Sequence, residues 1–170
     1  MLYGGRVSKD DIRTQAYGTT DEAVAALGLA RSLGPTADGL DQLILEIQKQ
    51  LFVVGAELAT DAVNAEKLKP GISKVTDDMV HALEAHIDRM TDQSPLPNYF
   101  IVPGASSTSA VLDLARAVVR RAERFTVTMQ SQDMLSDDCA LRYLNRLSDL
   151  LFTAARFEEA ARGLQAPPSR

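Results

Sequence analysis

Cysteine and histidine are scarce in this sequence. Its 170 residues include one cysteine and two histidines. The single cysteine, Cys139, cannot form a disulfide within the chain, and it is too few for a zinc site. His81 and His86 are five residues apart, about 140° around a helix, and the paired Glu-x-x-His motif of a di-iron bundle does not occur. We therefore predict no metal site built by the protein.

Long apolar runs and excess positive charge are also absent. No segment approaches the roughly 20 apolar residues of a membrane span, and residues 1–9 lack the apolar segment of a signal peptide. The net charge is −5, which does not favour a broad nucleic-acid-binding surface. Together with the single cysteine, these absences predict a cytoplasmic protein that binds neither membranes nor nucleic acids.

Alternating polarity, the pattern of strands, never extends far enough to predict a sheet. Apolar residues instead recur three and four positions apart, most regularly over residues 38–60 in Leu40, Ile44, Ile47, Leu51, Val54 and Leu58. We predict helices over 19–33, 38–60, 76–93, 106–130 and 136–162, and a frayed tail over 166–170. This order favours an all-α, up-and-down five-helix bundle in which residues 1–170 form a single domain.

Capping residues predict where the helices begin. Thr19 and Glu22 have the spacing of a capping box, Thr76 precedes two acidic residues, and Ser106 or Ser107 begins the longest periodic segment. We expect these positions to start the first, third and fourth helices. The residues expected to face the core are Met79, Leu83, Ile87 and Met90 in the third helix, Val111, Leu114, Val118 and Phe125 in the fourth, and Leu144, Leu147, Leu151 and Ala154 in the fifth.

The fourth predicted helix carries three arginines on one face. Arg116, Arg120 and Arg124 are four residues apart, so they lie on successive turns. Like charges at this spacing destabilise a helix by about 0.2–0.5 kcal/mol per pair, a cost that a bound polyanion would reverse. The stripe is either an anion site or a solvated basic surface, in which Asp113 pairs with Arg116 and Glu123 with Arg120.

Other candidate site residues have two interpretations each. Asn145, Ser148 and Asp149 share a polar face that either contacts a nucleoside or is simply solvated. Asp21 lies in the first turn of the first predicted helix, where it either offsets the helix dipole or pairs with an arginine of another helix or subunit. Phe100 is either an apolar plug under the bundle or a ligand contact.

Six blocks of residues, in this order, resemble the propanediol-utilisation type of ATP:cob(I)alamin adenosyltransferase. The resemblance covers residues 2–156, and the last two blocks are specific in combination. The blocks are Gly5-Arg-Val-Ser-Lys-Asp-Asp11, Ala16-Tyr-Gly-Thr-Thr-Asp-Glu22, Gln48-Lys-Gln-Leu-Phe-Val-Val-Gly-Ala-Glu-Leu-Ala59, Phe100-Ile-Val-Pro-Gly104, Arg116-Ala-Val-Val-Arg-Arg-Ala-Glu-Arg124 and Tyr143-Leu-Asn-Arg-Leu-Ser-Asp149.

This resemblance implies a homotrimer with active sites between neighbouring subunits. Catalytic roles would fall to Arg120 on the ATP phosphates and to Asp21 and Arg116, the pair that joins subunits beside the site. Phe100 would pack near the lower face of the corrin and help to keep the cobalt without its lower ligand. The residues implied to bind the nucleotide are Lys9, Arg120, Arg121, Glu123, Arg124 and Asn145.

The chemistry that the resemblance implies is a nucleophilic displacement. Cob(I)alamin attacks C5′ of ATP and triphosphate leaves, with Mg²⁺ neutralising part of its charge. Fixed guanidinium groups suit a polyanionic leaving group, and the reaction needs no general base. The implied partners are ATP, the reduced corrinoid, and a corrinoid reductase or an adenosylcobalamin-dependent enzyme.

Two departures from the family pattern leave an alternative function open. Members commonly begin with a Thr- and Gly-rich loop that wraps the ATP phosphates, and this sequence begins after that position; Ala105 also stands where a second glycine is common. The alternative is a corrinoid-binding or delivery protein with impaired catalysis. A generic helical scaffold is the third interpretation, if the arginine stripe is only a solvated surface.

Overall fold

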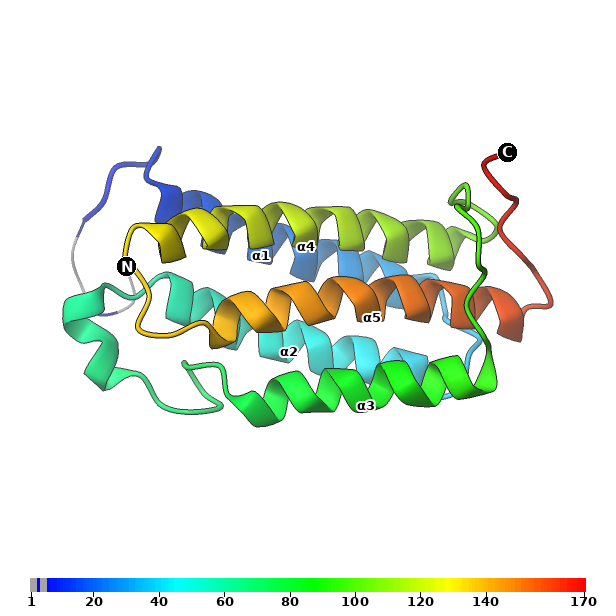
Figure 1. The fold of residues 1–170 in the computed structure, drawn as a ribbon, viewed down its shortest axis with the longest axis horizontal. Coiled ribbons are helices and arrows are strands. Elements are labelled where there is room, and N and C mark those ends of the chain that lie inside the picture. The colour runs from blue at the N-terminus through cyan, green and yellow to red at the C-terminus, as the bar shows by residue number, and fades with distance from the viewer. Residues whose placement is uncertain (1–2, 4–5) are drawn as a thin grey trace.

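The computed structural model describes residue 3 and residues 6–170, and this part of the chain is helical (Figure 1). Its elements are α1 (Ile12–Ser32), α2 (Leu40–Leu58), the 3-10 helix η1 (Ala62–Lys67), α3 (Asp77–Gln93), α4 (Ser107–Ser131) and α5 (Cys139–Ala161). Within the described ranges only two isolated β-bridges occur, and no strand is present. The all-helical prediction is confirmed.

Successive α-helices run in alternating directions along one long axis (Figure 1). α1 packs against α2 and α4, and α4 also packs against α5, so these four helices surround a common core. α3 lies on the outside of this group and packs mainly against α5. The loop from α3 to α4 and the segment after α5 meet at one end of the bundle.

The core follows most of the predicted apolar positions, including Val118 of α4, and Val111 and Phe125 are partly buried against this core. All six residues of the 38–60 stripe are buried, and so are Leu144, Leu147, Leu151 and Ala154 of α5. In α4, Leu114 is 55% exposed, so its predicted core position is wrong. Leu112, Ala115, Val119 and Ala122 are buried instead, because they occupy the face that turns toward α1 and α5. In α3, Leu83 and Met90 are buried, whereas Met79 and Ile87 are only partly buried against the core.

Two of the predicted helix starts are correct and one is wrong. The Thr76 hydroxyl accepts a hydrogen bond from the Met79 backbone N–H, and Ser106 forms a complete capping box at the start of α4. α1 begins at Ile12, where the Asp11 carboxylate accepts from the backbone N–H of Arg13, and not at Thr19. The Thr19 hydroxyl donates to the Gln15 carbonyl one turn back, as hydroxyls do inside helices.

Buried charged groups join segments that are far apart in the sequence. The Arg13 guanidinium donates to the carbonyl oxygens of Leu58 and Thr60 at 3.0 and 2.7 Å, which fixes the start of α1 to the end of α2. The Arg156 guanidinium binds Asp113 of α4 at 2.7 Å and Glu159 of α5 at 2.8 Å. Burial raises the pKa of Asp113 above its ordinary value, against the opposing effect of Arg156.

The frayed tail predicted for residues 166–170 is also wrong. Ala166 is buried, and residues 167–169 form backbone hydrogen bonds with residues 100–102. The described helices include none that combines the length and the apolar character needed to cross a bilayer.

Candidate functional site

α4 presents the predicted arginines because its opposite face is buried. Ser106 fixes the start of the helix, and the core residues of α4 turn inward, so Arg116, Arg120 and Arg124 lie on successive outward turns. Arg120 and Arg124 are exposed, whereas Arg116 is partly buried. In the part of the chain that the structure describes, no carboxylate lies within ion-pair distance of Arg120 or Arg124. These two guanidinium groups can therefore bind an anion.

Side chains on both sides of this stripe pair with neighbouring helices. Arg121 forms an ion pair with Glu22 of α1. On the other side, the Asn145 amide of α5 donates to the Glu123 carboxylate at 2.9 Å. The pairings expected for a solvated surface, Asp113 with Arg116 and Glu123 with Arg120, are not formed, because Asp113 binds Arg156 and Glu123 binds Asn145.

Asn145 is therefore held beside the arginine stripe by Glu123. The neighbouring Ser148, predicted to share its polar face, is buried and donates its hydroxyl to the Asn145 carbonyl at 2.9 Å. Asp149 is exposed and accepts from Arg146 at 2.9 Å. The structure thus brings Arg120, Glu123 and Asn145 together on adjacent surfaces of α4 and α5, where a guanidinium, a carboxylate and an amide offer both donors and an acceptor.

A second group of predicted residues lines a cavity toward the other end of α4. Phe100 and Arg116 border a cavity of about 410 Å³, and the Arg116 guanidinium carbon lies 5.5 Å from the centre of the Phe152 ring. Phe100 is 88% exposed, which rules out the interpretation that it plugs the bundle. The remaining lining residues are Ile87, Leu96, Arg146, Asp149, Phe152 and Thr153.

Asp21 lies in a different part of the molecule from Arg116. It is exposed on α1 and borders a separate groove of about 410 Å³ between α1 and α2, beside Phe52, which is 63% exposed. Because α1 begins at Ile12, Asp21 is not in the first turn, and the predicted interaction with the helix dipole is wrong. Among the described residues Asp21 and Arg116 do not form an ion pair within one chain.

Lys9 is exposed in the loop before α1, at the end of the bundle where α4 ends (Figure 1). Its carbonyl oxygen accepts from the Thr14 hydroxyl at 2.8 Å. Gly5, the first residue of the block that contains Lys9, lies outside the described residues. Across residue 3 and residues 6–170, no cluster of three His, Cys, Asp or Glu side chains is arranged to hold a metal ion.

Phe152 and Arg146 line the Phe100 cavity and were not predicted as site residues. Phe152 lies seven residues, or two helical turns, after Asn145, so helical spacing alone puts the two residues on one face of the helix. Its apolar side chain gave no reason to separate it from the core residues of α5. Arg146 is part of the Tyr143–Asp149 block, but its position between Asn145 and a buried leucine did not indicate which cavity it borders.

Comparisons with known proteins give one consistent result. Residues 1–158 match the model of a family described as cobalamin adenosyltransferase. The corrinoid adenosyltransferase of Citrobacter freundii is 44% identical over 159 residues, which cover 93% of this chain and 88% of that protein.

Solved structures agree with these sequence matches. A variant of the PduO-type ATP:corrinoid adenosyltransferase from Lactobacillus reuteri, complexed with cobalamin and ATP, superposes with a TM-score of 0.85 at 33% identity, covering 96% of this chain and 89% of that one. Another variant from that organism, complexed with ATP, gives a TM-score of 0.88 at 31% identity, covering 99% and 93%.

Proposed function

The chain belongs to the cobalamin adenosyltransferase family, and from this premise we propose how its residues transfer the 5′-deoxyadenosyl group of ATP to cob(I)alamin. The reaction gives adenosylcobalamin and triphosphate. The comparisons favour this enzyme activity over a corrinoid carrier with impaired catalysis, because the matched relatives are themselves adenosyltransferases. Residues 1–170 act as one cobalamin adenosyltransferase-like helical domain.

The observation that carries the assignment of roles is the pair of unpaired guanidinium groups on α4. Arg120 and Arg124 are exposed and have no carboxylate partner among the described side chains, so neither must break an ion pair to bind a phosphate. Arg120 binds the phosphates of ATP, with Arg124 and Lys9 adding positive charge. Asn145, held by Glu123 at 2.9 Å, contacts the nucleoside, and Arg121 completes the nucleotide site beside its partner Glu22.

The displacement requires stabilisation of the leaving group more than proton transfer. Cobalt(I) supplies the electron pair of the new cobalt–carbon bond, and the C5′–O bond breaks with its electron pair going to triphosphate. Guanidinium groups fixed beside the phosphates stabilise the negative charge that develops there. Mg²⁺, which nucleotide enzymes commonly bind together with substrate phosphates, would neutralise part of the same charge beside Arg120.

The corrinoid site in this proposal is the cavity that Phe100 and Arg116 border. A planar macrocycle needs flat apolar contacts, which Phe100 and the neighbouring Phe152 supply. Cob(I)alamin is a strong reductant, so a corrinoid reductase must generate it, and an adenosylcobalamin-dependent enzyme consumes the product. ATP as co-substrate and a single unpaired thiol suit the cytoplasm.

We further propose that the active unit is a homotrimer in which Asp21 of one subunit pairs with Arg116 of the next. Within one chain these side chains border different cavities, and Asp21 lies beside the exposed apolar ring of Phe52. Asp21→Arg should weaken assembly, and combining it with Arg116→Asp should restore it. Sedimentation velocity measures this, and a trimer that survives either single reversal unchanged would contradict the pairing.

Conversion of cob(I)alamin to adenosylcobalamin, followed by anaerobic absorbance with ATP and Mg²⁺, tests the proposed function. Arg120→Ala should lower kcat/KM for ATP by about 100-fold, the usual cost of removing one fixed donor at developing negative charge. Arg89→Ala, which removes an exposed arginine of α3, should leave turnover unchanged. Absence of turnover in the wild-type protein would refute the enzyme assignment, and equal rates in both variants would refute the role of Arg120.

A further inference from the structure

The segment that follows α5 runs antiparallel to the loop that carries Phe100. The Ser169 backbone N–H donates to the carbonyl oxygen of Phe100 at 2.8 Å, and the Val102 N–H donates to the carbonyl oxygen of Pro167 at 2.8 Å. Ile101 and Pro168 form the isolated antiparallel bridge between these two bonds. Three consecutive residues of the loop are thus paired with three consecutive residues of the segment, as in a minimal two-stranded ribbon.

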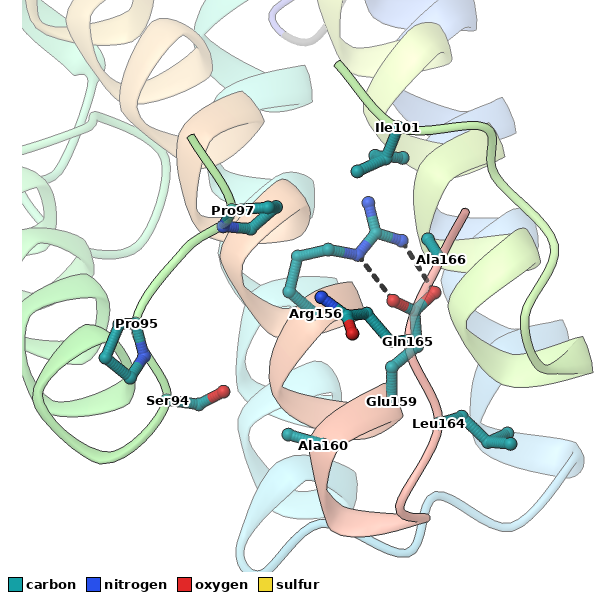
Figure 2. A pocket seen from close by; sticks show the side chains of 10 residues that line it. All are labelled: Ser94, Pro95, Pro97, Ile101, Arg156, Glu159, Ala160, Leu164, Gln165 and Ala166. Carbon is teal, nitrogen blue, oxygen red and sulfur yellow. Dashed lines mark hydrogen bonds and ion pairs between the residues drawn. The ribbon is translucent and has the colours of Figure 1, made fainter. Parts of the chain in front are cut away.

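Buried groups anchor this segment to the bundle. Ala166 is buried and lies across from Ile101, above the ion pair of Arg156 and Glu159 (Figure 2). These residues border a cavity of about 200 Å³ under the ribbon. Arg156 is in turn held by Asp113 of α4 at 2.7 Å. The 166–169 segment therefore rests on a charged network that is fixed to both α4 and α5.

The Phe100 ring cannot be oriented by packing. It is 88% exposed, yet it borders two neighbouring cavities of about 300 and 410 Å³. A ring with so little contact takes its direction from the backbone that carries it. The Phe100 carbonyl accepts from the Ser169 N–H, and two residues later the Val102 N–H donates to the Pro167 carbonyl.

We propose that residues 166–169 are a positioning element for Phe100, and that corrinoid capture depends on them. The inference rests on the proposed function, in which Phe100 contacts the corrin. The segment pairs with the loop at the end of the bundle where α4 begins. Arg120 and Arg124 belong to the second half of α4 and Asn145 to the first third of α5, toward the opposite end. A change in the segment should therefore alter the interaction with the corrinoid and leave the interaction with ATP unchanged.

Ser169→Pro tests this role because proline lacks the N–H that binds Phe100. Ser169→Ala is the matched control, since it removes the hydroxyl and keeps that donor. We expect Ser169→Pro to raise KM for cob(I)alamin about two- to tenfold, the usual effect of losing one hydrogen bond, with KM for ATP unchanged. Ser169→Ala should match the wild type in both constants.

Hydrogen exchange of the Val102 amide supplies a readout that does not depend on activity. This amide donates to Pro167 in the ribbon, so it should exchange faster in Ser169→Pro than in Ser169→Ala. Two outcomes would overturn the positioning role and leave the proposed function intact. One is an equal KM for cob(I)alamin in the two variants, and the other is an equal rise in KM for cob(I)alamin and in KM for ATP in Ser169→Pro. A wild-type protein without turnover would overturn the proposed function and this inference with it.

Discussion

Glu57 is expected to make the protein less stable as the pH rises through neutrality. It lies in the last turn of α2 and is 3% exposed. One carboxylate oxygen accepts from the Val75 backbone N–H at 2.7 Å, while the other is buried without a partner among the described residues. Burial raises the pKa of Glu57 from the ordinary 4.5 to about 7, opposed by the bond from Val75, with smaller contributions from Asp137 and Lys74.

The direction of the effect follows from proton binding. Between pH 4.5 and 7 the folded chain holds the proton of Glu57 and the unfolded chain releases it, so raising the pH favours unfolding. The contribution of Glu57 to the free energy of unfolding is fully present below pH 4.5 and is lost by the time the pH has passed 7. A shift of this size corresponds to about 3 kcal/mol in total, of which about 2 kcal/mol falls between pH 5.5 and 8.

Glu57→Gln isolates this contribution because the amide keeps an acceptor for the Val75 N–H and does not ionise. The free energy of unfolding of the variant and the wild type is measured in urea at pH 5.5, 7 and 8, at one protein concentration. Between pH 5.5 and 8, the difference between the two proteins should change by about 2 kcal/mol in favour of the variant. Glu66→Gln, the same substitution at an exposed carboxylate of η1, is the matched control for the chemical change. Parallel curves for the wild type and Glu57→Gln would refute the reasoning.

Three further predictions concern the buried Arg13 and Leu147 and the partly buried Cys139. Arg13→Met should lower the free energy of unfolding by about 3 kcal/mol in urea, because the carbonyl oxygens of Leu58 and Thr60 lose their buried donors; a loss below about 1 kcal/mol would contradict this. Leu147→Ala should cost about 2–5 kcal/mol in the same assay, since it empties a fully buried site, and a smaller loss would mean that the core can close around it. Burial, with the nearby carboxylates, raises the pKa of the Cys139 thiol, so iodoacetamide at pH 8 should alkylate it more slowly in the folded protein than in urea, as followed by mass spectrometry; equal rates would contradict that pKa.

Local patterns predicted the features that depend on spacing along one helix. The 38–60 stripe was correct because burial of one helical face requires apolar residues three and four apart, and the same spacing put Arg116, Arg120 and Arg124 on adjacent turns. Thr19 failed as a start signal because the spacing of Thr19 and Glu22 also occurs inside a helix, and Glu22 was engaged elsewhere.

Features that depend on tertiary packing could not be predicted in this way. Glu22 and Arg121 are 99 residues apart, and only the packing of α1 against α4 brings them together. Residues 167–169 bind the Phe100 loop through backbone N–H and carbonyl groups. Every residue carries these groups, except that proline lacks the N–H, so the amino-acid composition does not reveal the pairing and suggested a frayed tail. The exposure of Phe100 likewise follows from how the loop is held, not from the residue type.

The peripheral position of α3 limits the number of helices that it contacts. It packs mainly against α5 and buries Leu83 and Met90, whereas α1 and α4 each pack against two helices. The loop that carries Phe100 follows directly after the C-terminal end of α3. A displacement of α3 would therefore move one end of this loop, while the 166–169 segment holds the other end by backbone hydrogen bonds. Such a displacement is expected to move the Phe100 loop while the packing of α1 against α4 stays in place.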